Sequence, residues 1–314
     1  MTAPWVLYEI TRECNRACVY CYNRDRAAPR VGDLAPRKLE PLLDRLFAAG
    51  PLAGVTIIGG EPLTEDALED VVRRFVRRGA RVVVSTNALL LDRARLDALL
   101  DAGVSGFEVS LDSADRSTHA KLTGGPGVEQ VGAALAELAA AAVPVTVGAM
   151  LTAHNHEDLD DLLKLCFALS VERVMLNQLA PVGGARARAA ELTLSDGQLR
   201  RVLGWANQRA AELDLTIGIG LPVEPCRIDR GAFPNLQFEA CRCGADKWVV
   251  EPGGEVRVCE LHEAPVGNLH SDSLVSLAAG DAVGRFRKDH RAECTTCPDW
   301  TECRGGCRFL RPSR

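Results

Sequence analysis

The sequence predicts an α/β protein in which a partial (β/α)6 TIM-like barrel over residues 1–221 precedes a small cysteine-rich domain with a β-hairpin over residues 222–314. Three observations predict this fold. Six short β-branched or apolar runs alternate with longer amphipathic stretches, which indicates a parallel sheet. Cysteine, glycine and polar residues directly follow several of these runs, at the edge of the sheet where barrel enzymes have their active sites. Near residue 221, Pro and Gly become frequent and a dense group of cysteines begins.

The predicted elements follow one another as βα units. Strands are expected where β-branched and apolar residues cluster, and helices where apolar residues recur at helical spacing between capping residues. A further helix at 195–213 and a short strand at 215–219 end this part of the chain. The six strands are expected at 6–10, 55–58, 82–85, 107–111, 145–150 and 173–177, and the helices at 37–48, 65–78, 93–101, 128–142 and 158–168.

The composition is that of an ordinary globular protein. Of the 314 residues, 47% are hydrophobic and 25% are charged, and the formal net charge of -5 gives no electrostatic footprint for nucleic acid. The N-terminus lacks the basic and then apolar layout of a signal peptide, and no long uninterrupted apolar run is present. We therefore expect a cytoplasmic protein that binds neither nucleic acid nor a membrane.

Twelve cysteines form two groups and one isolated residue. Three lie from Cys14 to Cys21, eight lie from Cys226 to Cys307, and Cys166 stands alone on the apolar face of a predicted helix, where we expect a buried thiol. Because a reducing cytosol does not sustain structural disulfides, groups this dense favour metal ligation. The sequence therefore predicts two metal-binding regions.

The first group has the spacing C-x3-C-x2-C, given by Cys14, Cys18 and Cys21. One short loop with this spacing can ligate three irons of a 4Fe-4S cluster and leaves the fourth iron without a protein ligand. An electron-transfer cluster would use a fourth cysteine nearby, so the missing ligand favours a substrate or cofactor at the open iron. A zinc loop or three unrelated cysteines is the alternative.

At this spacing the sequence resembles the radical S-adenosylmethionine (radical SAM) enzymes. In that family the amino and carboxylate groups of SAM chelate the open iron, and reductive cleavage of SAM gives a 5′-deoxyadenosyl radical that abstracts hydrogen from the substrate. The resemblance implies a catalytic role for Cys14, Cys18 and Cys21. It also implies SAM as a cofactor and an external electron donor such as flavodoxin or ferredoxin.

The resemblance extends to cofactor-binding positions. Tyr20 occupies the aromatic position that lies against adenine in the family. Gly59, Gly60, Glu61 and Pro62 match the family's GGEP motif, whose glycines allow close backbone approach to the methionine amino group and whose glutamate accepts a hydrogen bond from it. Four more positions match residues that hold the cofactor's carboxylate or ribose, with turn formation as the alternative role. They are Thr86, Asn87, Ser110 and Asp112.

The second cysteine group resembles the SPASM extension of radical SAM proteins, which carries auxiliary 4Fe-4S clusters. The Pro-Gly-Gly turn at 252–254 lies between two alternating runs and predicts a β-hairpin that delivers Cys259 at its end. Eight thiolates can fully ligate two clusters. For the first auxiliary cluster we expect Cys241, Cys243, Cys259 and Cys307, with Cys226 competing for one place.

The set of cysteine ligands predicted for the second auxiliary cluster is less complete. No cysteine follows Cys307, whereas a later cysteine completes this cluster in full SPASM domains. We expect Cys294, Cys297 and Cys303 as ligands, with Cys226 or another group as the fourth.

Two alternatives stay open for this region. Paired cysteines also suit structural zinc. A spare thiol among Cys226, Cys241 and Cys243 would instead serve as a hydrogen donor to a substrate radical, as in family epimerases.

The resemblance implies a maturase that crosslinks, oxidises or epimerises a ribosomally synthesised peptide, although fold-level analogy does not fix function. Because the first predicted strand lies close to the N-terminus, we expect a separate leader-recognition protein. A dehydrogenase or epimerase of a sugar or aminocyclitol is the alternative, and a non-enzymatic redox sensor would form no 5′-deoxyadenosine. Polar residues in plausible positions for substrate contact are Asp112, Glu108, His119, Asn177 and Gln178, with a solvated-surface or structural role as the alternative for each.

Overall fold

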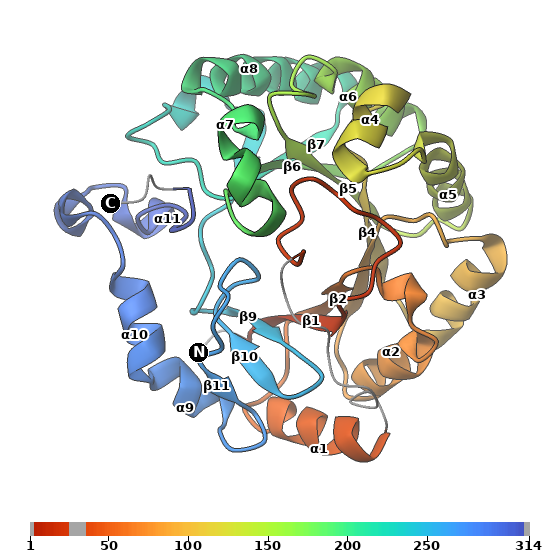
Figure 1. Ribbon diagram of the computed structural model, residues 1–314, viewed down its shortest axis with the longest axis vertical. Coiled ribbons are helices and arrows are strands. Elements are labelled where there is room, and N and C mark those ends of the chain that lie inside the picture. The colour runs from red at the N-terminus through yellow and green to blue at the C-terminus, as the bar shows by residue number, and fades with distance from the viewer. Residues whose placement is uncertain (1–2, 25–35, 311–314) are drawn as a thin grey trace.

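The computed structural model describes residues 3–24 and 36–310, and a parallel sheet forms its centre (Figure 1). Seven strands lie side by side in chain order, each parallel to the next. They are β1 (Trp5–Thr11), β2 (Gly54–Gly59), β3 (Val82–Thr86), β4 (Gly106–Ser110), β5 (Val145–Leu151), β6 (Arg173–Gln178) and β7 (Thr216–Gly220). All seven strands predicted from the sequence are therefore present.

The sheet continues beyond β1 and β7, the first and last of the predicted strands. β8 (Leu236–Phe238) is parallel to β7, and β9 (Lys247–Val250) is parallel to β1, with Trp5 opposite Lys247. β10 (Glu255–Arg257) and β11 (Gly267–Asn268) add antiparallel strands outside β9. In the described part of the chain, no pairing joins β11 to β8, so the barrel is open and the predicted α/β partial-barrel class is confirmed. The boundary at residue 221 remains a prediction.

Helices surround the outside of the sheet (Figure 1). Those predicted from the sequence are α1 (Pro36–Phe47), α2 (Leu68–Arg77), α3 (Arg93–Ala102), α5 (Val128–Ala140), α6 (Leu159–Ala168) and α8 (Asp196–Leu213). The predicted helix 65–78 begins three residues later, at Leu68, and residues Pro62–Thr64 before it form a separate turn of 3-10 helix, η1, capped by the Glu61 side chain. None of the helices in the described ranges is long and apolar enough to cross a membrane.

Several short helices were not predicted. α4 (Arg116–Thr123) begins at Asp115, whose side chain accepts a hydrogen bond from Thr118 N at 2.8 Å, and ends at Gly124 in the left-handed conformation. Its sequence has few apolar residues, so the helical period is weak and only the two caps indicate it. The others are α7 (Ala189–Leu192), α9 (Leu274–Ala279), α10 (Asp281–Lys288), α11 (Trp300–Cys303), η2 (Gly183–Arg188), η3 (Arg230–Ala232) and η4 (Ala292–Thr296).

The side chains of each strand alternate between the helix layer and the barrel interior. In β4, Phe107 and Val109 are buried in the core between sheet and helices, whereas Glu108 and Ser110 line a cavity inside the barrel. Cys166 on α6 belongs to the same core and is fully buried, as predicted. The strands thus supply a rigid apolar outer layer and a polar interior.

The hairpin predicted around 252–254 is confirmed. β9 and β10 are joined by a tight turn in which Glu251 N donates to Glu255 O at 3.0 Å, and Gly254 takes a positive φ of 87° that favours glycine. Cys259 lies two residues after the end of β10. Because β9 pairs with β1, the hairpin holds this cysteine against the barrel itself.

Candidate active site and auxiliary cysteine site

A cavity of about 680 Å³ lies at the carboxyl ends of the strands, a size typical of small-molecule cofactor sites. The loop that follows β1 crosses this mouth of the barrel (Figure 1) and brings Cys14, Cys18 and Cys21 to the cavity wall. Most of the predicted cofactor-binding residues line the same cavity, although they come from four different strand ends. These residues are Tyr20, Gly59, Gly60, Glu61, Thr86, Asn87 and Ser110.

The three thiols suit an iron-sulfur cluster by their placement and their environment. Burial raises the pKa of Cys18 to about 12, with the charge of Asp112 adding to the effect, and burial also raises the pKa values of Cys14 and Cys21. Three thiolates at one cavity wall are therefore unfavourable without a metal cation. Iron bound there would deprotonate the thiols outright and balance their charge.

Gly59 and Gly60 let the end of β2 touch the cysteine loop. A Cβ at Gly60 would lie 2.0 Å from the carbonyl oxygen of Glu13, and one at Gly59 would lie 2.1 Å from that of Thr11. The contact is hydrogen-bonded, since Gly60 N donates to Thr11 O at 2.8 Å and Glu61 N donates to Glu13 O at 2.7 Å. The glycines therefore bring two backbone segments together as well as leaving room at the cavity.

Glu61 is a buried acceptor that joins the segment after β2 to the end of β3. Its carboxylate accepts hydrogen bonds from Thr86 Oγ1 at 2.6 Å, Asn87 N at 2.7 Å and Leu63 N at 3.0 Å. Burial raises the pKa of Glu61, and these hydrogen bonds oppose the rise. Only Asn87 N is bonded to Oε2 among the described residues, so this oxygen keeps acceptor capacity toward the cavity.

Asp112 and Pro62 differ in placement from the other predicted residues, because neither lines the cavity. Asp112 lies behind Tyr20: it accepts a hydrogen bond from the Tyr20 hydroxyl on one oxygen and from Met150 N at 2.9 Å on the other. Burial raises the pKa of Asp112 to about 6, and the hydrogen bond from Tyr20 opposes the rise. Pro62 is buried as the first residue of η1, where its ring starts the turn.

A second cavity, of about 480 Å³, brings together the four cysteines predicted for the first auxiliary cluster. Cys241, Cys243, Cys259 and Cys307 all line it, although the first and last are 66 positions apart in the sequence. This cavity adjoins the first one, and the two share part of their walls inside the barrel. The shared wall consists of Leu7, Thr56, Glu108, Asn177, Leu221, Lys247 and Glu260.

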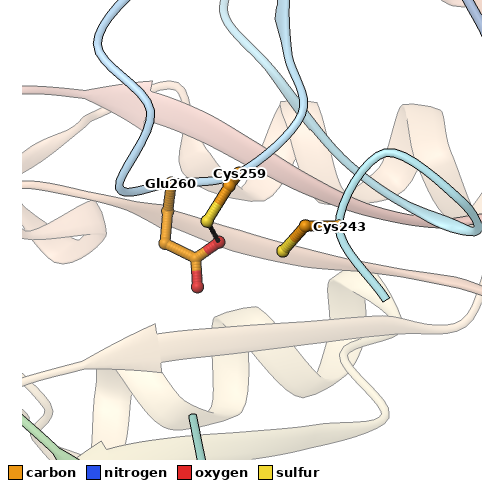
Figure 2. Close-up of side chains that lie close together, drawn as sticks. All are labelled: Cys243, Cys259 and Glu260. Atoms are coloured by element: carbon orange, nitrogen blue, oxygen red, sulfur yellow. Dashed lines mark hydrogen bonds between the residues drawn. The ribbon is translucent and has the colours of Figure 1, made fainter. Parts of the chain in front are cut away.

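Figure 2 shows the most compact ligand group of the second cavity, Cys243, Cys259 and Glu260. Their ligand atoms all lie within 4.8 Å of one another, and the Cys259 thiol donates to Glu260 Oε2 at 3.4 Å. Lys247 Nζ lies 2.8 Å from Glu260 Oε1, so the carboxylate is already paired with a cation. The chemistry of this donor set, four thiols at one cavity, fits an iron-sulfur cluster.

The closing cysteine run lies against the segment that carries Cys226. Cys303 is buried in α11 and Cys226 is exposed. A Cβ at Gly306 would lie 2.4 Å from Glu224 Oε1, so the residues around 224 pack directly on the turn that follows Cys303. This packing brings the Cys226 segment beside the run that also contains Cys294 and Cys297.

Four of the polar candidates for substrate contact line the first cavity: Glu108, His119, Asn177 and Gln178. His119 is buried, and its Nδ1 has no hydrogen-bond partner within the described residues. Burial, followed by the charge of Arg16, lowers the pKa of His119 to about 4, so the ring is neutral at pH 7. Sequence reasoning missed Lys247 and Glu260, for which adjacency to the hairpin and to Cys259 was the available signal.

Comparison with known proteins agrees with this geometry. The family model for the radical SAM superfamily matches residues 8–166, and the model for the SPASM iron-sulfur cluster-binding domain matches residues 241–299. An AdoMet-dependent heme synthase from Oleidesulfovibrio alaskensis is 25% identical over 96% of this chain and 82% of its own length. A PqqA peptide cyclase from Ruegeria pomeroyi is 27% identical over 98% of this chain and 84% of its own length.

The fold also matches a solved structure. The crystal structure of Streptococcus suis SuiB bound to precursor peptide SuiA superimposes with a TM-score of 0.77 at 16% identity, covering 97% of this chain and 72% of that one. The superfamily match spans half of the chain and includes the C-x3-C-x2-C loop and the GGEP motif. The chain therefore belongs to the radical SAM superfamily and carries a SPASM iron-sulfur cluster-binding domain.

Proposed function

We propose that this protein modifies a ribosomally synthesised peptide by abstracting hydrogen from a residue held between its two cysteine sites. The observation that supports the proposal is the shared wall between the two cavities, because a substrate residue bound at that wall would lie within reach of both. The similarity to a PqqA peptide cyclase and to peptide-bound SuiB supports a peptide as the substrate. Crosslinking, oxidation and epimerisation are the reactions that fit this arrangement.

Each predicted residue of the first cavity then has a role. Cys14, Cys18 and Cys21 would hold the catalytic cluster, and Oε2 of Glu61 would accept a hydrogen bond from the amino group of SAM. Asp112 would act through Tyr20, since its hydrogen bond fixes the ring that would lie against adenine. Thr86, Asn87 and Ser110 would bind the cofactor's carboxylate and ribose. When bound, the cluster and SAM supply a 5′-deoxyadenosyl radical that takes hydrogen from the substrate.

The auxiliary ligands follow from the packing of the cysteine-rich region. We assign Cys241, Cys243, Cys259 and Cys307 to the first auxiliary cluster because they line one cavity. The second cluster takes Cys294, Cys297 and Cys303, with Cys226 as the fourth ligand. The contact between Glu224 and Gly306 supports this last assignment.

Replacing Cys226 with alanine is expected to remove between about one and four iron atoms per chain, because the second auxiliary cluster loses a ligand. Iron analysis of the anaerobically reconstituted protein measures this loss. The matched control is Cys166→Ala, which removes a buried thiol of the α6 core and leaves the iron content unchanged. Equal iron in the Cys226 variant and the wild type would exclude Cys226 as a ligand.

Mass spectrometry of candidate precursor peptides co-expressed with the protein tests the proposed reaction. The loss of a pair of hydrogen atoms indicates a crosslink or an oxidation, and an unchanged mass with deuterium uptake from heavy water indicates epimerisation. We expect the assay to need an external donor such as flavodoxin or ferredoxin and a separate leader-recognition protein. Unmodified peptides under conditions that do yield 5′-deoxyadenosine would contradict a peptide substrate.

A small-molecule substrate is the second candidate, and the similarity to AdoMet-dependent heme synthases favours it. The second cavity has cationic side chains on its wall, among them Arg81 and Arg308, which would suit the carboxylates of such a substrate, whereas Arg173 is paired with Glu239 at 2.9 Å. Incubation of the reconstituted protein with iron porphyrins that carry carboxylate side chains separates the two candidates. A shift in porphyrin mass without any peptide modification would favour the second.

A further inference from the structure

A fully buried ion pair connects the two cysteine sites. The Arg257 guanidinium on β10 contacts the Glu9 carboxylate on β1, and the two residues are 248 positions apart in the sequence. Their side chains are 1% and 0% exposed. A buried pair of this kind is maintained only when further hydrogen bonds satisfy both partners, so its remaining contacts show what it holds in place.

On the catalytic side, the pair holds the end of the Cys14–Cys21 loop. Oε1 of Glu9 accepts a hydrogen bond from Asn23 Nδ2 at 2.9 Å and one from the Tyr22 hydroxyl at 3.4 Å. Asn23 Nδ2 also donates to Gly59 O at 3.1 Å, at the start of the GGEP motif. Tyr22 and Asn23 directly follow Cys21, so Glu9 fixes the backbone beside the third cysteine.

On the auxiliary side, the same guanidinium holds the loop that follows Cys259. Arg257 Nη1 donates to Glu260 O at 3.0 Å and to His262 O at 3.3 Å. Arg257 Nε donates to Glu251 Oε1 at 2.9 Å, and the other oxygen of Glu251 pairs with Arg12. Arg12 lies just before Cys14, so one side chain reaches both ends of the catalytic loop through its two carboxylate partners.

We propose that Arg257 is a positioning residue that couples the geometry of the auxiliary cysteine loop to that of the catalytic cysteine loop through Glu9 and Glu251. The N–H donors of a guanidinium point in fixed directions, and here Nε, Nη1 and Nη2 reach two carboxylates and the carbonyls after Cys259. Lysine cannot reproduce these contacts. The proposal holds whichever substrate the enzyme takes, because it concerns the sites and their mutual placement.

The test is hydrogen exchange on the full-length, iron-loaded protein, measured anaerobically on segments 12–24 and 258–262. We expect Arg257→Lys and Arg257→Met each to accelerate exchange about tenfold in both segments, because the loops lose a shared anchor. Glu9→Gln is expected to accelerate exchange in the same two segments, because it removes the carboxylate that pairs with Arg257. Arg257→Lys keeps a buried cation for Glu9 and serves as the folded variant if Arg257→Met does not accumulate.

The matched control is Arg74→Met, which removes an arginine that pairs with Glu40 and Asp70 between outer helices. We expect it to change exchange in neither segment. A second readout is the electron paramagnetic resonance signal of the reduced protein, where SAM should shift the signal less in the Arg257 variants. Hydrogen exchange that accelerates only in segment 258–262, or equally over the whole chain, would contradict the proposed coupling.

Discussion

Replacing Cys18 with alanine is expected to lower the formation of 5′-deoxyadenosine roughly a thousandfold or more, since the reaction loses its reductive centre. Cys18 is the central cysteine of the loop and lies beside Tyr20 at the cavity wall, with Asp112 behind the tyrosine ring. Incubation of the reconstituted protein with SAM and dithionite, followed by chromatography, measures the product. Iron should fall by about four atoms per chain while the auxiliary clusters remain.

The matched control for this experiment is again Cys166→Ala, which removes a thiol that touches neither cavity. We expect it to retain product formation and iron. Product formation at the wild-type rate in the Cys18 variant would exclude the loop as the catalytic site.

Replacing Gly60 with alanine is expected to lower SAM cleavage about a hundredfold and to destabilise the fold by about 3 kcal/mol. The new Cβ would lie 2.0 Å from Glu13 O, a backbone atom that cannot move without breaking the hydrogen bond from Glu61 N to the same oxygen. The cysteine loop would then separate from the end of β2. Product assays and urea unfolding measure the two effects.

Gly132→Ala provides the matched control because it makes the same chemical change in the interior of α5. A Cβ there meets no atom within 4 Å, and alanine is the better helix former by about 1 kcal/mol. We therefore expect unchanged activity and equal or higher stability. Equal behaviour of the two variants would show that the contact between Gly60 and Glu13 does not hold the site together.

Local sequence patterns predicted the parts of the fold that depend on residues close together in the sequence. The alternation of β1 to β7 with helices, the hairpin at 252–254 and the buried Cys166 all follow from periodicity and turn residues. The pairing of β9 with β1 could not be predicted, because parallel pairing between distant segments leaves no signal in either one. α4 was missed because its amphipathic period is weak, and only Asp115 and Gly124 mark its ends.

The candidate site likewise has features that the sequence predicted and features that it could not predict. Motif spacing predicted the residues that the strand ends bring to the first cavity, since the carboxyl ends of parallel strands meet at one edge. It could not predict that Asp112 lies behind Tyr20, because strand register alone does not say which polar group reaches the cavity and which one supports it. The Glu9–Arg257 pair was equally inaccessible, since each residue reads as an ordinary surface charge until the fold buries it.

The most direct test of the account is the electron paramagnetic resonance spectrum of the anaerobically reconstituted, reduced wild-type protein, recorded before and after addition of SAM. We predict a 4Fe-4S signal that SAM shifts, together with 5′-deoxyadenosine in the same sample. A signal that SAM leaves unchanged, with no 5′-deoxyadenosine formed, would contradict an open iron at the Cys14, Cys18 and Cys21 loop.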